Sequence, residues 1–168
     1  AGNYTLVQPA GVTANITAAS LAVTGAVAAN KVYDATTAAS LSGATITPLG
    51  TDAVTLVAGT GVFADKNVGT GKAVTVSGYS ISGADAGNYT LVQPAGVTAN
   101  ITAASLAVTG VIAANKVYDG VTTATLGGSA TITVLGTDAV SLGGVGVGVF
   151  ADKNVGTGKA VTVSGYSI

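Results

Sequence analysis

The side chains able to do chemistry in this chain are Asp, Lys, Tyr, Ser and Thr, because its 168 residues include no His, Cys, Glu or Arg. General acid–base catalysis near neutral pH therefore has no ready group, since His is the side chain that titrates there. A Ser–Lys or paired-Asp site could be built in principle. The Asp residues are spread one to a turn, however, where a carboxylate usually bonds its own backbone. We therefore predict no enzymatic activity and assign no catalytic or cofactor-binding residue.

Calcium binding and an isopeptide crosslink are two further chemistries that these residue types allow. The candidate calcium ligands of one module are Asp34, Asp52, Asp65 and Asp85. Ca²⁺ takes about six to eight oxygen ligands, and the chain has no dense D-x-D-x-D loop, so turn capping is the favoured role and no metal ligand is assigned. Lys31 lies beside Tyr33, as Lys116 does beside Tyr118. Isopeptide bonds normally need a buried Glu or Asp to move the proton, and a Lys stem lying over a sheet edge is the simpler interpretation.

Charge is sparse along the whole chain. Charged residues are 8% of the sequence, six Lys against seven Asp, for a net charge of −1, where an ordinary globular protein has roughly 25%. Without a basic field to attract phosphates, nucleic acid is not an expected partner. Residues 86–115 carry no charge, but Asn, Thr, Gln and Pro interrupt them. A spanning helix needs about 20 predominantly apolar residues, so no membrane span is expected.

A long internal repeat organises the sequence. Residues 1–25 return unchanged at 86–110, and residues 62–81 return at 149–168. The offset grows from 85 to 87 between these two matches, which implies two single-residue insertions, expected near Gly120 and within the stretch GGVGVGVF. A period of 85–87 residues fits a small autonomous domain repeated along a chain.

The local patterns within one repeat are those of β-strands. Apolar and polar residues alternate at 97–102, 21–24 and 130–134, between Gly, Pro, Asn and Asp. Pro48 indicates a strand end or an edge, and a bulge at Gly78 would restore the register of 72–81. With about seven short strands and little helix, the sequence predicts an all-β fold of tandem, immunoglobulin-like antiparallel β-sandwich modules.

One stretch sharpens the sandwich prediction. Residues 85–91, DAGNYTL, resemble the D-x-G-x-Y-x-C stretch of immunoglobulin domains, in which the Tyr hydroxyl bonds back across a corner. Leu91 stands at the Cys position. The alternative is a polar turn followed by a strand that points Tyr89 and Leu91 inward. In both cases Tyr89 has a structural role.

Several longer motifs identify a family resemblance. NKVYDATTAA and NKVYDGVTTATL, followed by GTDAV, VFADKNVGTGKAVTVSGYSISGADAGNYTL and ANIT, strongly resemble the YDG domain, a repeat of secreted bacterial surface proteins similar to filamentous-haemagglutinin-type adhesins. The resemblance implies a giant exported protein of Gram-negative type, extracellular or attached to the cell surface, with tandem copies that form a stalk or fibre. Ala35 replaces the Gly of this motif in the first copy, while the second has Gly120, which argues against a catalytic loop.

The usual frame of such repeats divides the chain into three parts. Residues 1–18 would be the C-terminal strands of a preceding repeat, 19–103 a complete repeat, and 104–168 the next repeat without its last strands. We expect residues 1–18 of one copy to complete the sandwich begun by 104–168 of the adjacent copy. The adjacent copy would belong either to a separate chain or to the same long chain. The mean hydropathy of +0.62 further predicts apolar contacts between modules, larger than crystal-packing contacts of about 800 Å².

Two functions are consistent with this sequence. The first is a structural repeat of an extracellular stalk, fibre or filament, whose partners are neighbouring copies of the same repeat. The alternative is an adhesin binding module that presents a repeated surface to sugar, ice or a host protein. Binding surfaces usually carry aromatic or charged anchors, and aromatics are 5% of this chain, which favours the structural role. Buried tyrosines would support the fibre, and an exposed row of them would support binding.

Overall fold

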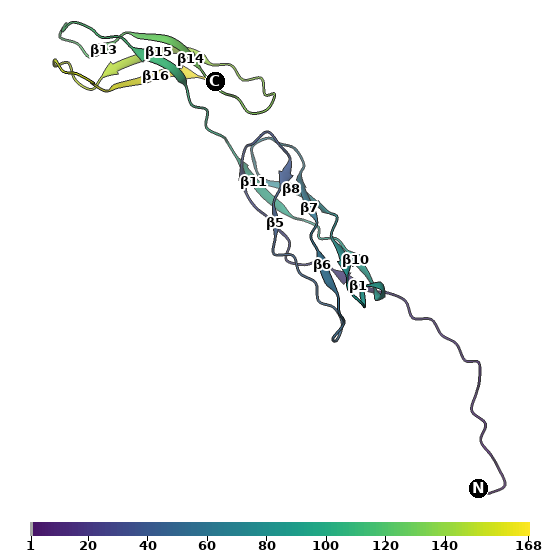
Figure 1. Cartoon of the computed structure of the whole chain (residues 1–168). Helices are drawn as coiled ribbons and strands as arrows, with labels where there is room; N and C mark the ends of the chain where they lie inside the picture. Colours follow the sequence, from purple (N-terminus) through teal and green to yellow (C-terminus); the bar gives the residue numbers. More distant parts are fainter. Residues whose placement is uncertain (1) are drawn as a thin grey trace. The chain divides into compact units, whose positions relative to one another are not determined.

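Strands make up nearly all the regular structure of the computed structural model, which describes residues 2–168 (Figure 1). The one helical segment in this range is a 3-10 turn, η1 (Ala86–Asn88). The all-β prediction is confirmed. None of the helices in the described range is long and apolar enough to cross a membrane. The chain divides into two compact units, of which unit 2 comprises residues 31–36, 66–68 and 101–168 and unit 1 the remainder.

The strands of unit 1 form one larger sheet and three two-stranded ladders. The larger sheet has five strands in the order β3 (Lys31–Val32), β11 (Thr98–Thr102), β8 (Gly69–Ser77), β7 (Thr60–Phe63) and β4 (Ala38–Ala39), of which β3 belongs to unit 2. The ladders pair β1 (Ala19–Ala22) with β10 (Tyr89–Val92), β2 (Val27–Ala28) with β5 (Leu41–Ser42), and β6 (Thr55–Val57) with β9 (Ser80–Ser82). Strand β11 crosses the unit boundary, and its last two residues pair with β3 (Lys31–Val32) in unit 2.

Two of these pairings are parallel, where the sequence predicted antiparallel neighbours throughout. β10 runs parallel to β1, with Ala19 opposite Tyr89 and Ala22 opposite Val92. β11 runs parallel to β3, with Ile101 opposite Lys31. Parallel neighbours need a long connection, and about 70 residues separate the members of each pair. Alternation within a strand does not report the direction of its partner, so the sequence pattern could not reveal this.

The core of unit 1 is drawn from strands along the whole first repeat. Its buried members, all less than 9% exposed, are Leu21, Val23, Ala28, Phe63, Val74, Val76, Tyr79, Tyr89 and Ala99. Phe63 is 2% exposed and lies opposite Val74 in the β7–β8 ladder. Burying an aromatic or large aliphatic side chain contributes about 1.5–3 kcal/mol, so this core is the main stabilising element of the unit.

The second repeat forms two antiparallel sheets within unit 2. One pairs β12 (Thr109–Ala113) with β14 (Leu126–Thr131), and the other has the order β13 (Thr123–Ala124), β15 (Gly143–Phe150), β16 (Val161–Ser167). Strand β16 is therefore the edge of its sheet. Its counterpart in the first repeat, β8, lies between β7 and β11.

The structure also shows where the second repeat has its first extra residue relative to the first repeat. Leu41 covers Gly61, where an added Cβ would lie 2.8 Å from Leu41 Cδ2, and Leu126 covers Gly148 in the same way at 2.7 Å. Leu41 and Leu126 are thus equivalent, and the offset of 85 persists to Gly128. The extra residue lies after Gly128, and the position near Gly120 predicted from the sequence was wrong.

Gly78 has a different role from the predicted bulge. It has φ +76° and lies between β8 and β9, which belong to different sheets. The chain crosses from one sheet to the other at this point, and a residue without Cβ is suited to the turn. Its counterpart Gly165, with φ +88°, lies inside β16. Pro48 lies in a loop outside the strands, and not at the strand end or edge that the sequence predicted.

Residues 2–18 contain no strand, and each of them is exposed (Figure 1). The same sequence at 87–103 contributes to η1 and forms β10 and β11. Identical residues are therefore strands in one place and an unpaired segment in the other. Tertiary partners, and not local propensity, decide their conformation.

Candidate functional site

Tyr89 anchors β10 to a loop of the same unit. Its ring is 8% exposed, and its hydroxyl donates to the Asp52 carboxylate at 2.6 Å and accepts the Leu49 N–H at 2.8 Å. The bond to the Asp52 carboxylate is the main reason why the pKa of Tyr89 is raised, because it favours the neutral phenol. The hydroxyl thus serves packing, in agreement with the structural role predicted for Tyr89.

Gln93 continues the attachment after β10 ends. Its amide oxygen accepts the Tyr79 N–H at 3.1 Å, and its amide nitrogen donates to the Tyr79 carbonyl at 2.8 Å. The Val92 carbonyl accepts the Val23 N–H at 3.0 Å. Side chain and backbone together hold this segment in the unit.

Two asparagines attach β11. The Asn100 N–H donates to the Asn30 side-chain oxygen at 2.7 Å, and the Asn100 side-chain oxygen accepts the Gly71 N–H at 2.7 Å. The Val97 carbonyl accepts the Val74 N–H at 2.9 Å, just before the strand begins. Both edges of β11 are therefore fixed by specific bonds.

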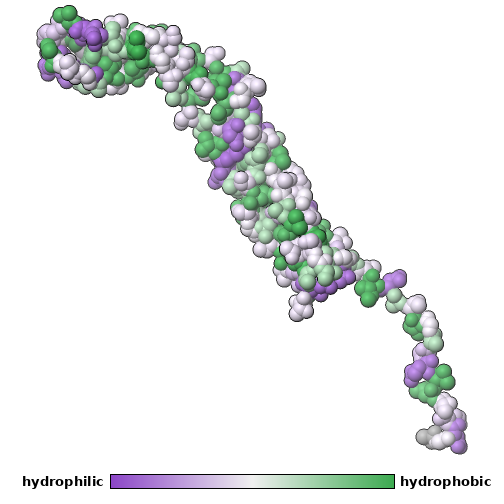
Figure 2. Space-filling view, in the orientation of Figure 1, coloured by the Kyte–Doolittle hydropathy of each residue, from purple (hydrophilic) through white to green (hydrophobic). Residues whose placement is uncertain are grey.

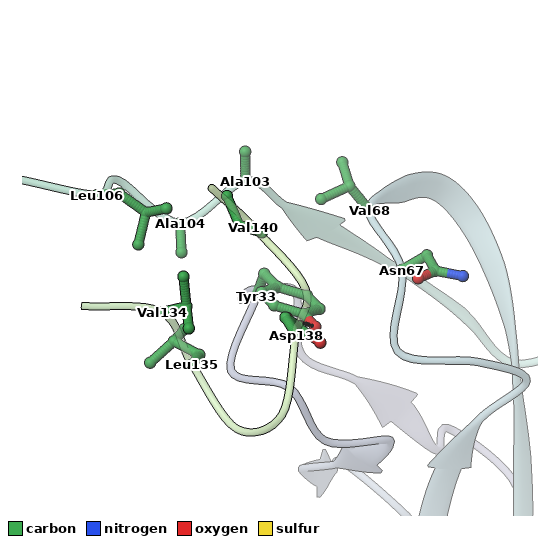
Figure 3. Close-up of a pocket in the computed structure, with 10 residues that line it drawn as sticks. All are labelled: Tyr33, Asn67, Val68, Ala103, Ala104, Leu106, Val134, Leu135, Asp138 and Val140. Carbon is green, nitrogen blue, oxygen red and sulfur yellow. Dashed lines mark hydrogen bonds between the residues drawn. The ribbon is translucent and has the colours of Figure 1, made fainter. Parts of the chain in front are cut away.

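A different polar cluster occurs in unit 2, at Tyr33, Lys66 and Asp138. Tyr33 and Asp138 are drawn in Figure 3. The Asp138 carboxylate accepts from the Tyr33 hydroxyl on one oxygen and from Lys66 Nζ on the other. The ammonium of Lys66 lies 5.9 Å from the centre of the Tyr33 ring. The hydrogen bond from Lys66 lowers the pKa of Asp138, while the bond to the Asp138 carboxylate raises the pKa of Tyr33. The phenol is therefore protonated near neutral pH, and the paired carboxylate is a weaker base than an unpaired one.

This cluster borders an apolar cavity of about 230 Å³. Figure 3 shows the aliphatic side chains gathered around the Tyr33 ring. The lining residues are Tyr33, Asn67, Val68, Ala103, Ala104, Leu106, Val134, Leu135, Asp138 and Val140.

Two larger cavities open on the second repeat. The first, of about 690 Å³, is lined by residues 113–118, Phe150, residues 152–159 and Val161. The second, of about 420 Å³, is lined by residues 108–111 and 163–166. Both cavities follow runs of consecutive residues, so they suit an extended peptide better than a compact small molecule.

The four candidate calcium ligands, for which turn capping was the favoured role, do not come together. Each bonds a neighbour of its own: Asp34 accepts from Lys31 and Thr36, Asp52 from Tyr89, Asp65 from Lys72, and Asp85 from the Ala53 N–H. Within residues 2–168, no three acidic side chains are grouped closely enough to hold a metal ion. The hydrogen bond from Lys31, followed by those from Thr36, lowers the pKa of Asp34 to about 2.

The Lys–Asp pairs recur in both repeats at the same places. Lys31–Asp34 and Lys72–Asp65 in the first repeat, both at 2.8 Å, correspond to Lys116–Asp119 and Lys159–Asp152 in the second. The Asp members are about half exposed, so each pair contributes little stability, typically ~1 kcal/mol or less. The pairs fix turns and do not form a reaction centre.

Comparison with known families assigns both repeats. The YDG domain model matches residues 17–99 and 102–168, which is most of the chain. The chain belongs to the YDG domain family. YDG domains are not known as enzymes. No curated protein and no solved structure is significantly similar to this pair of YDG repeats.

Sequence reasoning missed two of the hydrogen-bonded contacts described above, which lie within the units of these YDG repeats. Tyr33 and Asp138 are 105 residues apart, and neither position has an unusual neighbour that would indicate a bond between them. The role of Gln93 was equally hidden. Its only signal is that it is the sole Gln of the repeat and follows a strand, next to Pro94.

Proposed function

We propose that this chain is a structural part of a giant secreted bacterial surface protein, whose YDG repeats stack head to tail into an extracellular stalk, fibre or filament. Neighbouring copies of the same repeat are its partners. The observation that carries the proposal is the packing of the tyrosine side chains. Ligand-binding surfaces depend on accessible aromatic anchors, and the tyrosines of this repeat are used for packing.

Each tyrosine position is packed in at least one copy of the repeat. Tyr79 and Tyr89 are 7% and 8% exposed. The two strongly exposed tyrosines, Tyr4 and Tyr118, are sequence copies of the buried Tyr89 and the half-buried Tyr33. Their exposure follows from absent neighbours rather than from a ligand surface. This pattern supports the fibre over the adhesin alternative.

The surface chemistry supports the same role. Apolar residues reach the visible surface at many places, as the green atoms in Figure 2 show. Lys residues lie mostly in short-range pairs with Asp, and no group of three acidic residues that could hold a metal ion occurs among residues 2–168. Small apolar surfaces of this kind suit close contact between β-modules.

Arrays of different length test the proposal. Proteins with two, four and eight tandem repeats would be compared by small-angle X-ray scattering. A stalk predicts that the maximum dimension rises in proportion to repeat number. A collapsed cluster would grow only as roughly the 0.38 power of chain length, and that result would overturn the proposal. Specific binding of single repeats to sugars, ice or host proteins would favour the adhesin instead.

A further inference from the structure

The Tyr–Asp–Ala motif of the first repeat, residues 33–35, is a turn whose shape is fixed by its own hydrogen bonds. The Asp34 carboxylate accepts Lys31 Nζ at 2.8 Å and the Thr36 N–H at 2.9 Å. Ala35 has φ +63°, in the left-handed region that favours Gly. The last two residues of the motif therefore serve the turn itself, and Tyr33 is left to make contacts outside it.

The second repeat builds the same turn at residues 118–120. The Asp119 carboxylate accepts Lys116 Nζ at 2.8 Å and the Val121 N–H at 3.1 Å, and Gly120 has φ +82°. The third position has a positive φ in both copies, which is the physical reason for a Gly in this motif. Because both copies have the turn, a contact that it makes can recur along a chain of repeats.

The end of β11 positions Tyr33. The Tyr33 N–H donates to the Thr102 carbonyl at 2.8 Å, and the Thr102 hydroxyl donates to the Lys31 carbonyl at 3.4 Å. These bonds continue the β3–β11 ladder by one residue. Residues 31–36 belong to unit 2, the unit that contains the second repeat, although their sequence is part of the first repeat.

The partner of Tyr33 is the GTDAV turn of the second repeat, residues 136–140. The Tyr33 hydroxyl donates to one oxygen of the Asp138 carboxylate, and Lys66 Nζ donates to the other. Lys66 also belongs to unit 2. Val140, a further residue of this turn, lines the same cavity as the Tyr33 ring (Figure 3). The first repeat thus holds the turn by a phenol and an ammonium that bind the same carboxylate.

Ala35 and Gly136 show how closely the two turns approach each other. A Cβ added at Gly136 would lie 3.0 Å from the Ala35 Cβ, which is tighter than ordinary van der Waals contact. Gly136 therefore leaves the space that the third motif residue needs. At Gly50, the equivalent residue of the first repeat, an added Cβ would meet no other atom of residues 2–168 within 4 Å. The close approach is a property of this contact and not of the GTDAV turn alone.

We propose that the Tyr–Asp–Gly turn of one YDG repeat, together with the Lys of its ADKN stretch, docks on the GTDAV turn of the next repeat and joins consecutive repeats of a chain. This inference rests on the proposed head-to-tail stacking and names the residues that make the contact. Each repeat has both sides of the joint, because Tyr118 repeats Tyr33 and Asp52 repeats Asp138.

The joint is compatible with the bonds inside a repeat. In the first repeat, the carboxylate of Asp52 accepts the hydroxyl of Tyr89, which belongs to the same repeat. A carboxylate has about four acceptor positions on its two oxygens. A carboxylate at this place can therefore receive a phenol of its own repeat and a phenol and an ammonium of the preceding one.

A disulfide between the two turns tests the contact. The chain has no Cys, and disulfides need Cβ atoms about 3.5–4.5 Å apart, which positions 35 and 136 reach after a small shift. Oxidation of the dilute full chain with Ala35→Cys and Gly136→Cys should give a monomer whose thiols no longer react with a maleimide. Ala35→Cys with Gly50→Cys is the matched control, because Gly50 and Gly136 have nearly the same φ, +54° and +58°. We expect free thiols in this control. Equal disulfide formation in both variants, or none in either, would overturn the proposal.

Charge exchange tests the joint without any change at a glycine. Lys66→Glu places a second carboxylate beside Asp138 and should speed the amide exchange of Tyr33 at least about threefold. Adding Asp138→Lys should recover at least part of the protection. Lys153→Glu makes the same change at the equivalent residue of the second repeat, outside this joint, and should leave the exchange of Tyr33 as it is. Unchanged exchange in Lys66→Glu, or no recovery in the double variant, would contradict the joint.

The joint and the stalk fail separately. If the disulfide and the charge exchange both give negative results while arrays lengthen in proportion to repeat number, the stalk is supported and the joint is overturned. If the disulfide forms as expected and arrays do not lengthen, the contact between the turns is supported and the stalk is overturned.

Discussion

The first and second repeats have nearly the same residues at nearly the same spacing, yet only the first buries its core. Val23 and Val76 are 5% and 8% exposed, and their counterparts Val108 and Val163 are 37% and 40% exposed. Phe63 is buried, while Phe150 is half-buried. In the first repeat, β10 and β11 pack against these core residues. The comparison teaches that the core of a YDG repeat is completed by its last two strands.

The largest expected effect is the loss of a core aromatic. Phe63→Ala should destabilise unit 1 by about 3–5 kcal/mol, because it removes a fully buried ring and leaves a cavity. Phe150→Ala should cost clearly less, since its ring is already partly exposed. Urea unfolding followed by circular dichroism would measure both. Equal losses would break the comparison between the repeats.

Removing one hydroxyl should distinguish the two copies of the same tyrosine. Tyr89→Phe removes two hydrogen bonds of a buried side chain, one of them to the Asp52 carboxylate, and should cost about 1–3 kcal/mol. Tyr4→Phe should leave the stability of the monomer unchanged, because Tyr4 is 90% exposed. The same unfolding experiment at low protein concentration gives both values. A loss of stability from Tyr4→Phe in the monomer would contradict the assignment of residues 2–18 as unpaired.

Two equivalent glycines should tolerate alanine differently. A Cβ at Gly59 would lie 2.5 Å from the Ser77 carbonyl oxygen, within the backbone of the neighbouring strand. A Cβ at Gly146 would meet the Tyr166 ring, 2.5 Å from its hydroxyl, and that half-buried side chain can move. Gly59→Ala should therefore destabilise by about 1–3 kcal/mol and Gly146→Ala by less. Thermal unfolding of both variants measures the two losses of stability. A larger loss from Gly146→Ala than from Gly59→Ala would contradict this prediction.

The smallest expected effect concerns acid stability. The pKa of Asp34 is about 2 in the folded chain, against an ordinary value of 3.8, because Lys31 and Thr36 bond its carboxylate. This stabilisation is complete above pH 4 and is lost as the pH falls through the range from about 4 to 2. In the second repeat, Val121 stands in place of Thr36 and offers no hydroxyl to Asp119.

Asp34→Asn should therefore flatten the dependence of stability on pH in this range more than Asp119→Asn does. Unfolding in urea at pH values between 2 and 5 would measure the two slopes. An equal change in both variants would show that the Thr36 bonds do not matter.

The sequence was informative where a pattern is local. Alternating residues located β11 and much of β8, and the repeat itself led to the family. Parallel pairing and the Tyr33–Asp138 bond were out of reach, because partners separated by about 70 to 105 residues leave no trace in one sequence. Gly78 was misinterpreted because a bulge and a change of sheet both require the same positive φ.

Amide hydrogen exchange of the full chain tests most directly the central claim that β10 and β11 complete the core of a repeat. In the first repeat, the N–H groups of Val23 and Val74 are bonded to the segments around β10 and β11. These two amides should be protected, while their counterparts Val108 and Val161 should exchange rapidly. Protection of Val108 and Val161 equal to that of Val23 and Val74 would contradict this claim.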